Sequence, residues 1–276
     1  MKKHRPKEFQ LPDGRRIVCH SRTDFDILVR EFIDNDIYAI PGIRIPEGGC
    51  VVDVGANVGF FVLQVNQLIK SGTVYAFEPI PATFDLLQEN TRRHNKLDIR
   101  LFPCGLADAS GVATFKFFPK TSVASTMDFQ STSESRWRAR NFIHEEIKNM
   151  GGLLGKIASW TPMWFWFPVT ETVRWYFQKG YPVDCQIRTL SEVIDEENIE
   201  RIDLLKVDVE GAEDLVLSGI RGEHWPLIRQ AIIEVHDGEA MAEQIIGRLT
   251  QYGYETKSEP AMKGVDHLWL VSAVRA

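Results

Sequence analysis

Charged side chains with acid–base chemistry stand at the ends of two apolar stretches of the sequence. These stretches are LLKVDVEG, residues 204–211, and IIEVHD, residues 232–237. An imidazole titrates near neutrality and suits the removal of a proton from a hydroxyl, while a nearby carboxylate orients the ring or the substrate. We therefore predict that His236 is a catalytic base and that Asp208 and Glu210 assist it.

Other interpretations of the same residues stay open. Alternation along a strand places Lys206, Asp208 and Glu210 on one side, where Lys206 and one carboxylate would form a supporting ion pair. His236 would then only cap a loop. Asp208, Glu234 and His236 could also bind a divalent metal that lowers the pKa of an acceptor. No dense ligand spacing supports this alternative, so no metal site is predicted.

A glycine-rich turn follows the first strongly apolar run, VVDVGANVGFFVL, residues 51–63. Small residues there let the backbone approach a ligand, and the start of the following helix offers N–H groups to it. An acid about 20 residues further on, at the end of the next strand, can accept both hydroxyls of a ribose. The predicted cofactor-binding residues at this point are Asp53, Gly55, Ala56, Asn57, Gly59 and Glu78, together with Asp208.

The type of cofactor follows from what the turn lacks and from Asp53. The GANVG segment is neither a GxGxxG fingerprint nor a phosphate-binding loop with Gly-Lys-Ser/Thr. An acid at position 53 would face a cationic group well and a pyrophosphate poorly, because like charges repel. S-adenosylmethionine carries a sulfonium and an ammonium and no phosphate, so we predict that cofactor. The alternative is a tight turn that binds no ligand.

Strands that alternate with helices must position these groups. From Cys50 onward, apolar strand-like runs alternate with amphipathic helices, a pattern typical of a parallel sheet with helices on both faces. A hairpin over residues 9–20 and a helix over residues 24–38 are predicted to form an N-terminal extension, residues 1–48. The 276 residues are expected to form a single domain with one helical insertion, residues 131–180.

Five segments resemble the FkbM family of S-adenosylmethionine-dependent O-methyltransferases. They are VVDVGANVGFF, AFEPIPATFDLLQENTRRHN, LADASGVATF, IDLLKVDVEGAEDLVLSGI and IIEVH. The resemblance implies a class I methyltransferase (Rossmann-like) fold, in which a seven-stranded, mostly parallel sheet ends in an antiparallel strand. It implies methyl transfer to a hydroxyl of a small molecule, natural product or glycan. It also implies that the backbone at Gly105 and Leu106 passes the adenine.

The insertion departs from the shorter members of this family. Residues 131–180 hold five of the seven tryptophans, and we expect them to form a lid over the acceptor. Ser125, Trp164 and Trp166 are the predicted substrate contacts. A helical pair packed on the core, a dimer contact and a peripheral membrane contact are the alternatives.

Composition narrows the partners and the compartment. The net charge of −6 and the lack of a basic surface argue against a nucleic-acid partner. The four cysteines form no CxxC pair, and no signal or spanning segment is apparent, so a reducing cytoplasm is expected. We expect a monomer or homodimer. An N-methyltransferase for a peptide or amine and an inactive cofactor-binding partner protein are the alternative functions.

Overall fold

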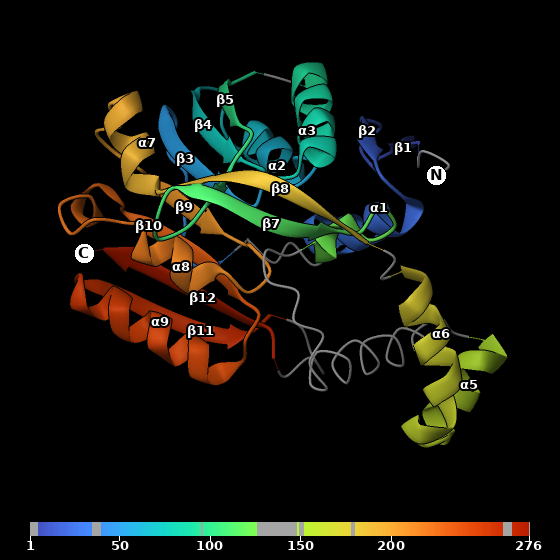
Figure 1. The fold of residues 1–276 in the computed structure, drawn as a ribbon. Coiled ribbons are helices and arrows are strands. Elements are labelled where there is room, and N and C mark those ends of the chain that lie inside the picture. Colours follow the sequence, from blue (N-terminus) through green and yellow to red (C-terminus); the bar gives the residue numbers. More distant parts are fainter. Residues whose placement is uncertain are drawn as a thin grey trace.

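The computed structural model of the chain centres on a seven-stranded sheet (Figure 1), with the strand order β11-β12-β10-β9-β3-β4-β5. Five neighbouring strands run parallel. Their bounds are Gln230–Val235 for β10, Leu204–Val207 for β9, Gly49–Val54 for β3, Gly72–Phe77 for β4 and Asp98–Phe102 for β5. The structure describes residues 5–34, 40–94, 96–125, 148, 152–177, 180–261 and 267–275.

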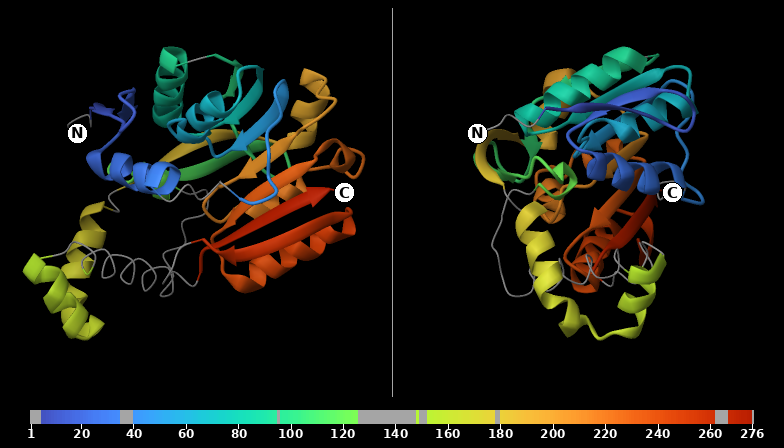
Figure 2. Two further views of the ribbon diagram at one scale, coloured as in Figure 1. Left: turned by 180° about the vertical axis from the view of Figure 1, so that it is seen from behind. Right: turned by 90° about the vertical axis from the view of Figure 1, so that its right-hand side faces the viewer.

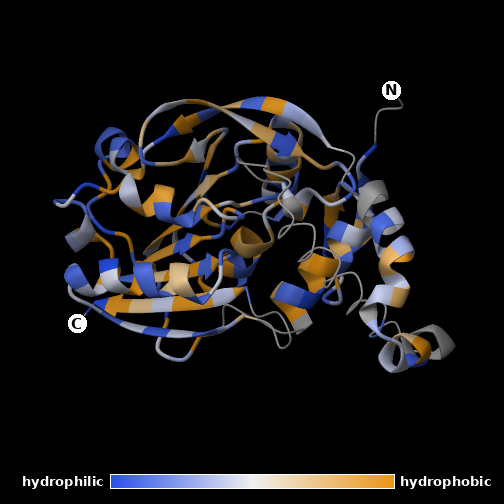
Figure 3. Cartoon of the chain, turned by 60° about the horizontal axis from the view of Figure 1, so that its bottom comes forward, coloured by the Kyte–Doolittle hydropathy of each residue, from blue (hydrophilic) through white to orange (hydrophobic). Residues whose placement is uncertain are grey.

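Helices cover both faces of this sheet, as the two hydrophobic cores show (Figure 2). Val52 and Val54 of β3 point into one core and Val51 points into the other, so the strand is apolar on both sides. Figure 3 shows the central strands as largely hydrophobic, and the helices around them in alternating bands. Helices α2 (Phe60–Leu68) and α3 (Pro81–His94) lie on one face, and α7 (Leu190–Glu197), α8 (Glu213–Ser218) and α9 (Glu239–Gln251) lie on the other.

The edge beyond β10 is antiparallel. β12 (Trp269–Arg275) pairs antiparallel with β10, and β11 (Tyr254–Pro260) pairs antiparallel with β12. β11 therefore occupies the edge of the sheet, and β12, the later strand in the chain, lies between β11 and β10. This arrangement confirms the expected fold class and the antiparallel strand.

A second sheet of three strands, ordered β6-β8-β7, lies beside the first. β6 is Gly105–Leu106, β7 is Gly111–Phe117 and β8 is Tyr181–Arg188. No strand or helix was predicted at β8 or α7, because β8 directly follows the irregular insertion. The start of α7 nevertheless has a local signal, since Thr189 and Glu192 form a reciprocal capping box.

The N-terminal extension forms the predicted hairpin, β1 (Lys7–Gln10) with β2 (Arg16–Cys19), and a helix. The helix is α1 (Arg22–Val29), which continues as the π-helical segment η1 (Arg30–Asp34). The last positions of the predicted helix 24–38 lie outside the described residues. The extension is attached to the domain, since the Val18 N–H donates to Asn90 of α3 at 2.8 Å.

The insertion contains helices, as predicted. They are α5 (Gly152–Trp160), the short 3₁₀ helix η3 (Met163–Trp166) and α6 (Phe167–Phe177), while residues 131–147, 149–151 and 178–179 lie outside the described residues. In Figure 1 these helices project on the side to which the parallel strands point, away from the sheet. Among the described helices, none is both long and apolar enough to cross a bilayer.

Candidate active site

The predicted cofactor turn joins β3 to α2 and is held against the end of β4. The N–H groups of Gly55 and Ala56 donate to the carbonyl of Phe77 at 3.1 and 2.9 Å. Gly55 has a φ of +82°, and a Cβ there would lie 1.8 Å from the backbone oxygen of Asp208. Only glycine fits this position, because the turn packs directly on the chain that leaves β9.

Two further residues of the turn also adopt left-handed conformations. Asn57 has a φ of +48° and Gly59, just before α2, has a φ of +95°. A Cβ on Gly59 would meet the Leu87 side chain of α3 at 2.9 Å, so this glycine allows α2 and α3 to pack closely. The N–H of Asn57 donates to Glu78 Oε2 at 3.1 Å.

Glu78 follows β4 and is almost fully buried, with 6% of its surface exposed. Its second oxygen, Oε1, accepts the N–H of Ile80 at 2.9 Å. Burial raises the pKa of Glu78 to about 7, although the two backbone donors oppose this shift. A carboxylate that accepts two N–H bonds keeps lone pairs for hydroxyl donors, so the site fits a ribose better than a pyrophosphate. Asn57 and Glu78 would hold the cofactor's ribose in this arrangement.

Gly105 and Leu106 form β6, which pairs with β8. A Cβ on Gly105 would lie 3.5 Å from Pro79 Cβ, next to Glu78 in the chain. The structure thus brings this backbone beside Glu78, the carboxylate predicted to bind the ribose. The predicted contact with adenine stays a prediction.

A buried ion-pair network connects the cofactor turn to β9. Lys206 Nζ lies 3.2 Å from Asp53 Oδ1 and 3.2 Å from Asp208 Oδ2, and it donates to the carbonyl of Gly55 at 3.1 Å. Although burial lowers the pKa of Lys206, the Asp208 and Asp53 carboxylates outweigh it and raise this pKa above its ordinary value. Asp53 is fully buried, and the cation it faces in the structure is Lys206.

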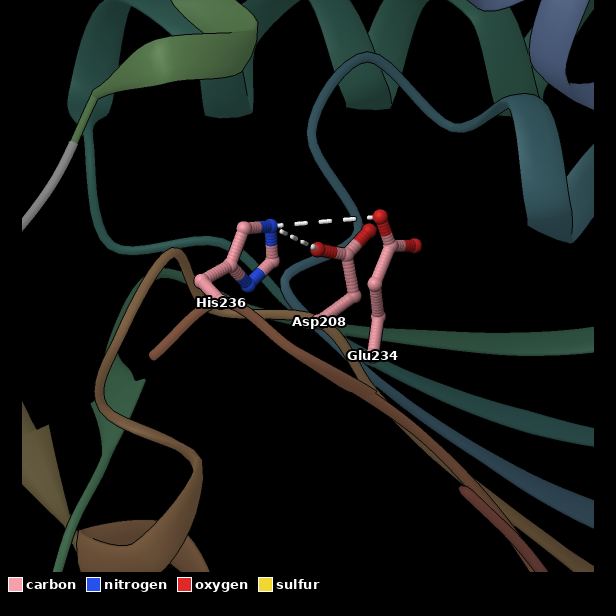
Figure 4. Close-up of side chains that lie close together, drawn as sticks. All are labelled: Asp208, Glu234 and His236. Atoms are coloured by element: carbon pink, nitrogen blue, oxygen red, sulfur yellow. Dashed lines mark ion pairs between the residues drawn. The ribbon is translucent and has the colours of Figure 1, made fainter. Parts of the chain in front are cut away.

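Two of the predicted catalytic residues, Asp208 and His236, come together with Glu234 at the carboxyl ends of β9 and β10 (Figure 4), and Glu210 joins them. His236 Nε2 lies 4.0 Å from Asp208 Oδ1, 3.9 Å from Glu234 Oε1 and 3.5 Å from Glu210 Oε2. β9 ends at Val207, so simple strand alternation does not place Glu210. A turn in which Glu210 has a φ of +56° brings its carboxylate back toward His236.

Two further acids belong to this cluster, and the sequence analysis missed both. Glu213 of α8 accepts a hydrogen bond from His236 Nδ1 at 2.8 Å and is 1% exposed at its side chain. It also accepts the N–H of Gly211 at 2.9 Å. Glu31 reaches the cluster from η1, where burial and the charges of Glu234 and Asp208 raise its pKa well above the ordinary value. Glu213 stands in the quoted KVDVEGAE motif, whereas no local pattern marks Glu31.

These charges govern the proton affinity of the cluster. Burial disfavours the charged imidazole of His236, but Glu210 and Glu213 outweigh it and raise the pKa of His236 well above its ordinary value. Burial is also the largest cause that raises the pKa of Glu210, to about 8. In this arrangement the imidazole holds its proton near neutrality, which opposes its predicted role as a base.

The three predicted substrate residues lie in different surroundings. Ser125 accepts the N–H of Phe118 through its hydroxyl at 3.1 Å. The Trp166 indole N–H donates to Thr161 at 2.7 Å, and this tryptophan is only 7% exposed, so it packs within the insertion. Trp164 is 73% exposed. Their contact with an acceptor stays a prediction.

Comparison with known proteins gives consistent matches. A family model described as the methyltransferase FkbM domain matches residues 53–256. The 31-O-demethyl-FK506 methyltransferase FkbM of Streptomyces tacrolimicus is 30% identical over 250 residues, which are 91% of this chain and 89% of that protein. Methyltransferase sdnD of Sordaria araneosa is 28% identical over 264 residues, or 92% of each chain.

Among solved structures, methyltransferase FkbM from Methylobacillus flagellatus KT aligns with a TM-score of 0.49 at 13% identity, over 86% of this chain and 47% of that one. The family model spans most of this chain and covers both the cofactor turn and the acid-rich strand ends. The chain therefore belongs to the FkbM family of methyltransferases and is an enzyme that uses S-adenosylmethionine.

Proposed function

We propose that this enzyme transfers the methyl group of S-adenosylmethionine to a hydroxyl of a small molecule. The observation that carries the proposal is the direct packing of the cofactor turn on the acid-rich strand end. Gly55 contacts the backbone of Asp208, and the Asp208 side chain is part of the cluster around His236. Groups that can handle a proton thus adjoin the cofactor site, as a hydroxyl acceptor requires.

The chain's own residues have distinct tasks in this reaction. The cofactor, when bound, supplies an electrophilic methyl group on a sulfonium. Glu78 and the turn at Asn57 hold its ribose, and Lys206 fixes the spacing of the two strand ends. The protonated imidazole of His236 orients the acceptor hydroxyl, and the carboxylates of Asp208 and Glu210 receive its proton.

The names of the relatives favour an oxygen acceptor in a small molecule. The Streptomyces tacrolimicus relative is named as a methyltransferase for 31-O-demethyl-FK506, which is an O-methylation of a small molecule. An amine acceptor fits the site less well, because a neutral amine attacks through its free electron pair and needs fewer proton acceptors. A glycan acceptor remains the second candidate within the hydroxyl class.

Labelled cofactor gives a direct test. The full chain is incubated with extracted metabolites and S-adenosylmethionine that carries a ¹³C-methyl group, and labelled products are found by mass. The carbon chemical shift of the new methyl group distinguishes attachment to oxygen from attachment to nitrogen. An N-methyl product, or no transfer to any hydroxyl compound, contradicts the proposal.

The insertion is proposed to cover the acceptor side of the site. Helices α5 and α6 project on the side of the carboxyl ends of the strands, and exposed aromatic residues lie on and between them, with Trp160 at 90% and Phe165 at 58% exposure. If the insertion is a lid, amide hydrogen exchange in residues 152–177 should slow when cofactor and acceptor are both present. Exchange that slows only on dimerisation or on addition of vesicles supports the interface or the membrane alternative instead.

A further inference from the structure

We propose that Asp208, Glu234 and His236 hold one divalent cation of the Mg²⁺ or Mn²⁺ type on the acceptor side of the active site. This inference rests on the proposed function, because the cation would act on the acceptor hydroxyl. It adds a metal ion to the groups that the cofactor and the chain supply.

The first argument is the geometry of the ligands. The three residues each offer one ligand atom, and these atoms all lie within 4.8 Å of one another. Figure 4 shows the three side chains converging from the ends of two adjacent strands. Ligand atoms around an octahedral Mg²⁺ lie about 2.1 Å from the ion, so they are about 3 Å apart when adjacent and about 4 Å when opposite. Only one ligand can lie opposite Nε2, so one of the two carboxylates, which lie 3.9 and 4.0 Å from it, must move about 1 Å closer to bind as an adjacent ligand.

The second argument is the support behind His236, and it is independent of the ligand set. Glu213 accepts from Nδ1 at 2.8 Å, so Nδ1 keeps its hydrogen, while Nε2, which is directed toward Asp208 and Glu234, would release its proton to bind the cation. A metal-binding histidine usually donates its other ring N–H to a carboxylate, which fixes its tautomer and orientation. Glu213 is itself held by the Gly211 N–H at 2.9 Å, so the whole arrangement is anchored to the backbone.

The third argument is the charge of the surroundings. Asp208 and Glu234 lie near two more acids, Glu210 and Glu31. The nearby ammonium of Lys206 is already shared between Asp53 and Asp208. These carboxylates attract a divalent cation, and oxygen ligands with one imidazole suit Mg²⁺ or Mn²⁺.

The cation would change the chemistry of the acceptor in a defined way. A hydroxyl oxygen bound to it loses its proton more easily, and Glu210, beside His236, can pass that proton to solvent. The oxygen then forms a bond to the methyl carbon while the bond from carbon to sulfur breaks, with its electron pair left on sulfur. One alcohol and one sulfonium thus give one methyl ether, one neutral thioether and one proton.

Titration of the full chain with Mn²⁺ tests this inference without any activity measurement. The chain is freed of metal by a chelator, and the electron paramagnetic resonance signal of free Mn²⁺ is followed in the absence of cofactor. We expect one saturable site. Glu234→Gln should weaken Mn²⁺ binding by more than about 100-fold, and Glu213→Gln by about 10–100-fold, as for other residues that support a ligand. Glu243→Gln, an exposed carboxylate on α9, is the matched control and should bind as the wild type does.

A second measurement needs no variant. Bound Mn²⁺ should selectively broaden the ring-proton signals of His236 in the wild-type protein. The inference is wrong if no saturable site exists, if Glu234→Gln binds Mn²⁺ as well as wild type, or if the His236 signals are unaffected. Hydroxyl methylation that persists in excess chelator overturns the metal site and leaves the proposed function intact. Mn²⁺ binding at these residues without any hydroxyl methylation would support the metal site and contradict the proposed function.

Discussion

The cofactor turn and the acid-rich cluster lie next to each other and are built by different means. In the turn, Glu78 accepts two backbone N–H groups, one from Asn57 in the glycine-rich turn and one from Ile80 two residues further on. In the cluster, the partners of His236 come from three separate elements, the ends of β9 and β10 and the start of α8. Backbone shape therefore defines the turn, whereas a balance of charges defines the cluster.

Lys206 joins the two regions, and its loss should have the largest effect. Lys206→Met leaves Asp53 and Asp208 without their shared cation, and removal of one partner from a buried pair costs about 3–5 kcal/mol. Urea unfolding of the variant measures this free energy. The exposed Lys257→Met serves as the control. The double variant Asp53→Asn with Lys206→Met should recover part of the loss, and a Lys206→Met loss below about 1 kcal/mol would contradict the role of this ion pair.

Two glycines sharpen the contrast between shape and charge. Gly55 of the turn and Gly211 of the cluster both have positive φ values, +82° and +100°. A left-handed backbone alone costs an alanine about 1–2 kcal/mol. A Cβ on Gly55 would also collide with a backbone oxygen at 1.8 Å, whereas the nearest atom to one on Gly211 is 3.6 Å away. Gly55→Ala should thus lose at least about 3 kcal/mol of unfolding free energy, and Gly211→Ala only about 1–2 kcal/mol. Equal losses in thermal unfolding would remove the distinction.

Asp24 lies in α1, the helix that continues into η1 and carries Glu31, so it tests the stability of this part of the fold. Its carboxylate is fully buried in α1 and accepts the N–H of Ser122 at 2.7 Å, and burial raises its pKa to about 6. The folded state thus binds this proton more tightly than the unfolded chain does. The resulting penalty is absent below about pH 4, grows as pH rises toward 6, and is complete above it, on the order of 3 kcal/mol. Relative to wild type, Asp24→Asn should therefore gain unfolding free energy between pH 4 and pH 7. A pH-independent difference in urea unfolding would contradict this.

Glu78 should make cofactor binding depend on pH, with the smallest effect of the four. The pKa of Glu78 is about 7 in the free protein, so half of the protein molecules carry a protonated Glu78 at pH 7. That proton must leave before the ribose hydroxyls can donate to a carboxylate. Affinity is lost as pH falls below 7, and binding should be about tenfold weaker at pH 6 than at pH 8. Calorimetry with S-adenosylhomocysteine measures this ratio. Glu78→Gln should bind more weakly at pH 8 and show no such dependence, and a dependence that persists in this variant would point to another group.

The difference between the two regions also explains what the sequence could predict. The turn was predictable in position and in its glycines from a short motif, and its acid at Glu78 from a typical spacing of about 20 residues. The meeting of Asp208, Glu234 and His236 followed from adjacent parallel strands. The arrival of Glu31 from an N-terminal π-helical segment and the pairing of Asp53 with Lys206 depend on tertiary packing, which no spacing in the sequence records.

The order of β11 and β12 has a consequence for how this protein is made. β12 lies between β10 and β11, although it is the later of the three strands in the chain. During synthesis β10 therefore presents an unpaired edge until residue 275 has left the ribosome, and β11 has no place in the sheet before then. An open edge of this kind invites pairing with other chains. A nascent chain whose synthesis stalls before β12 should therefore be prone to aggregation.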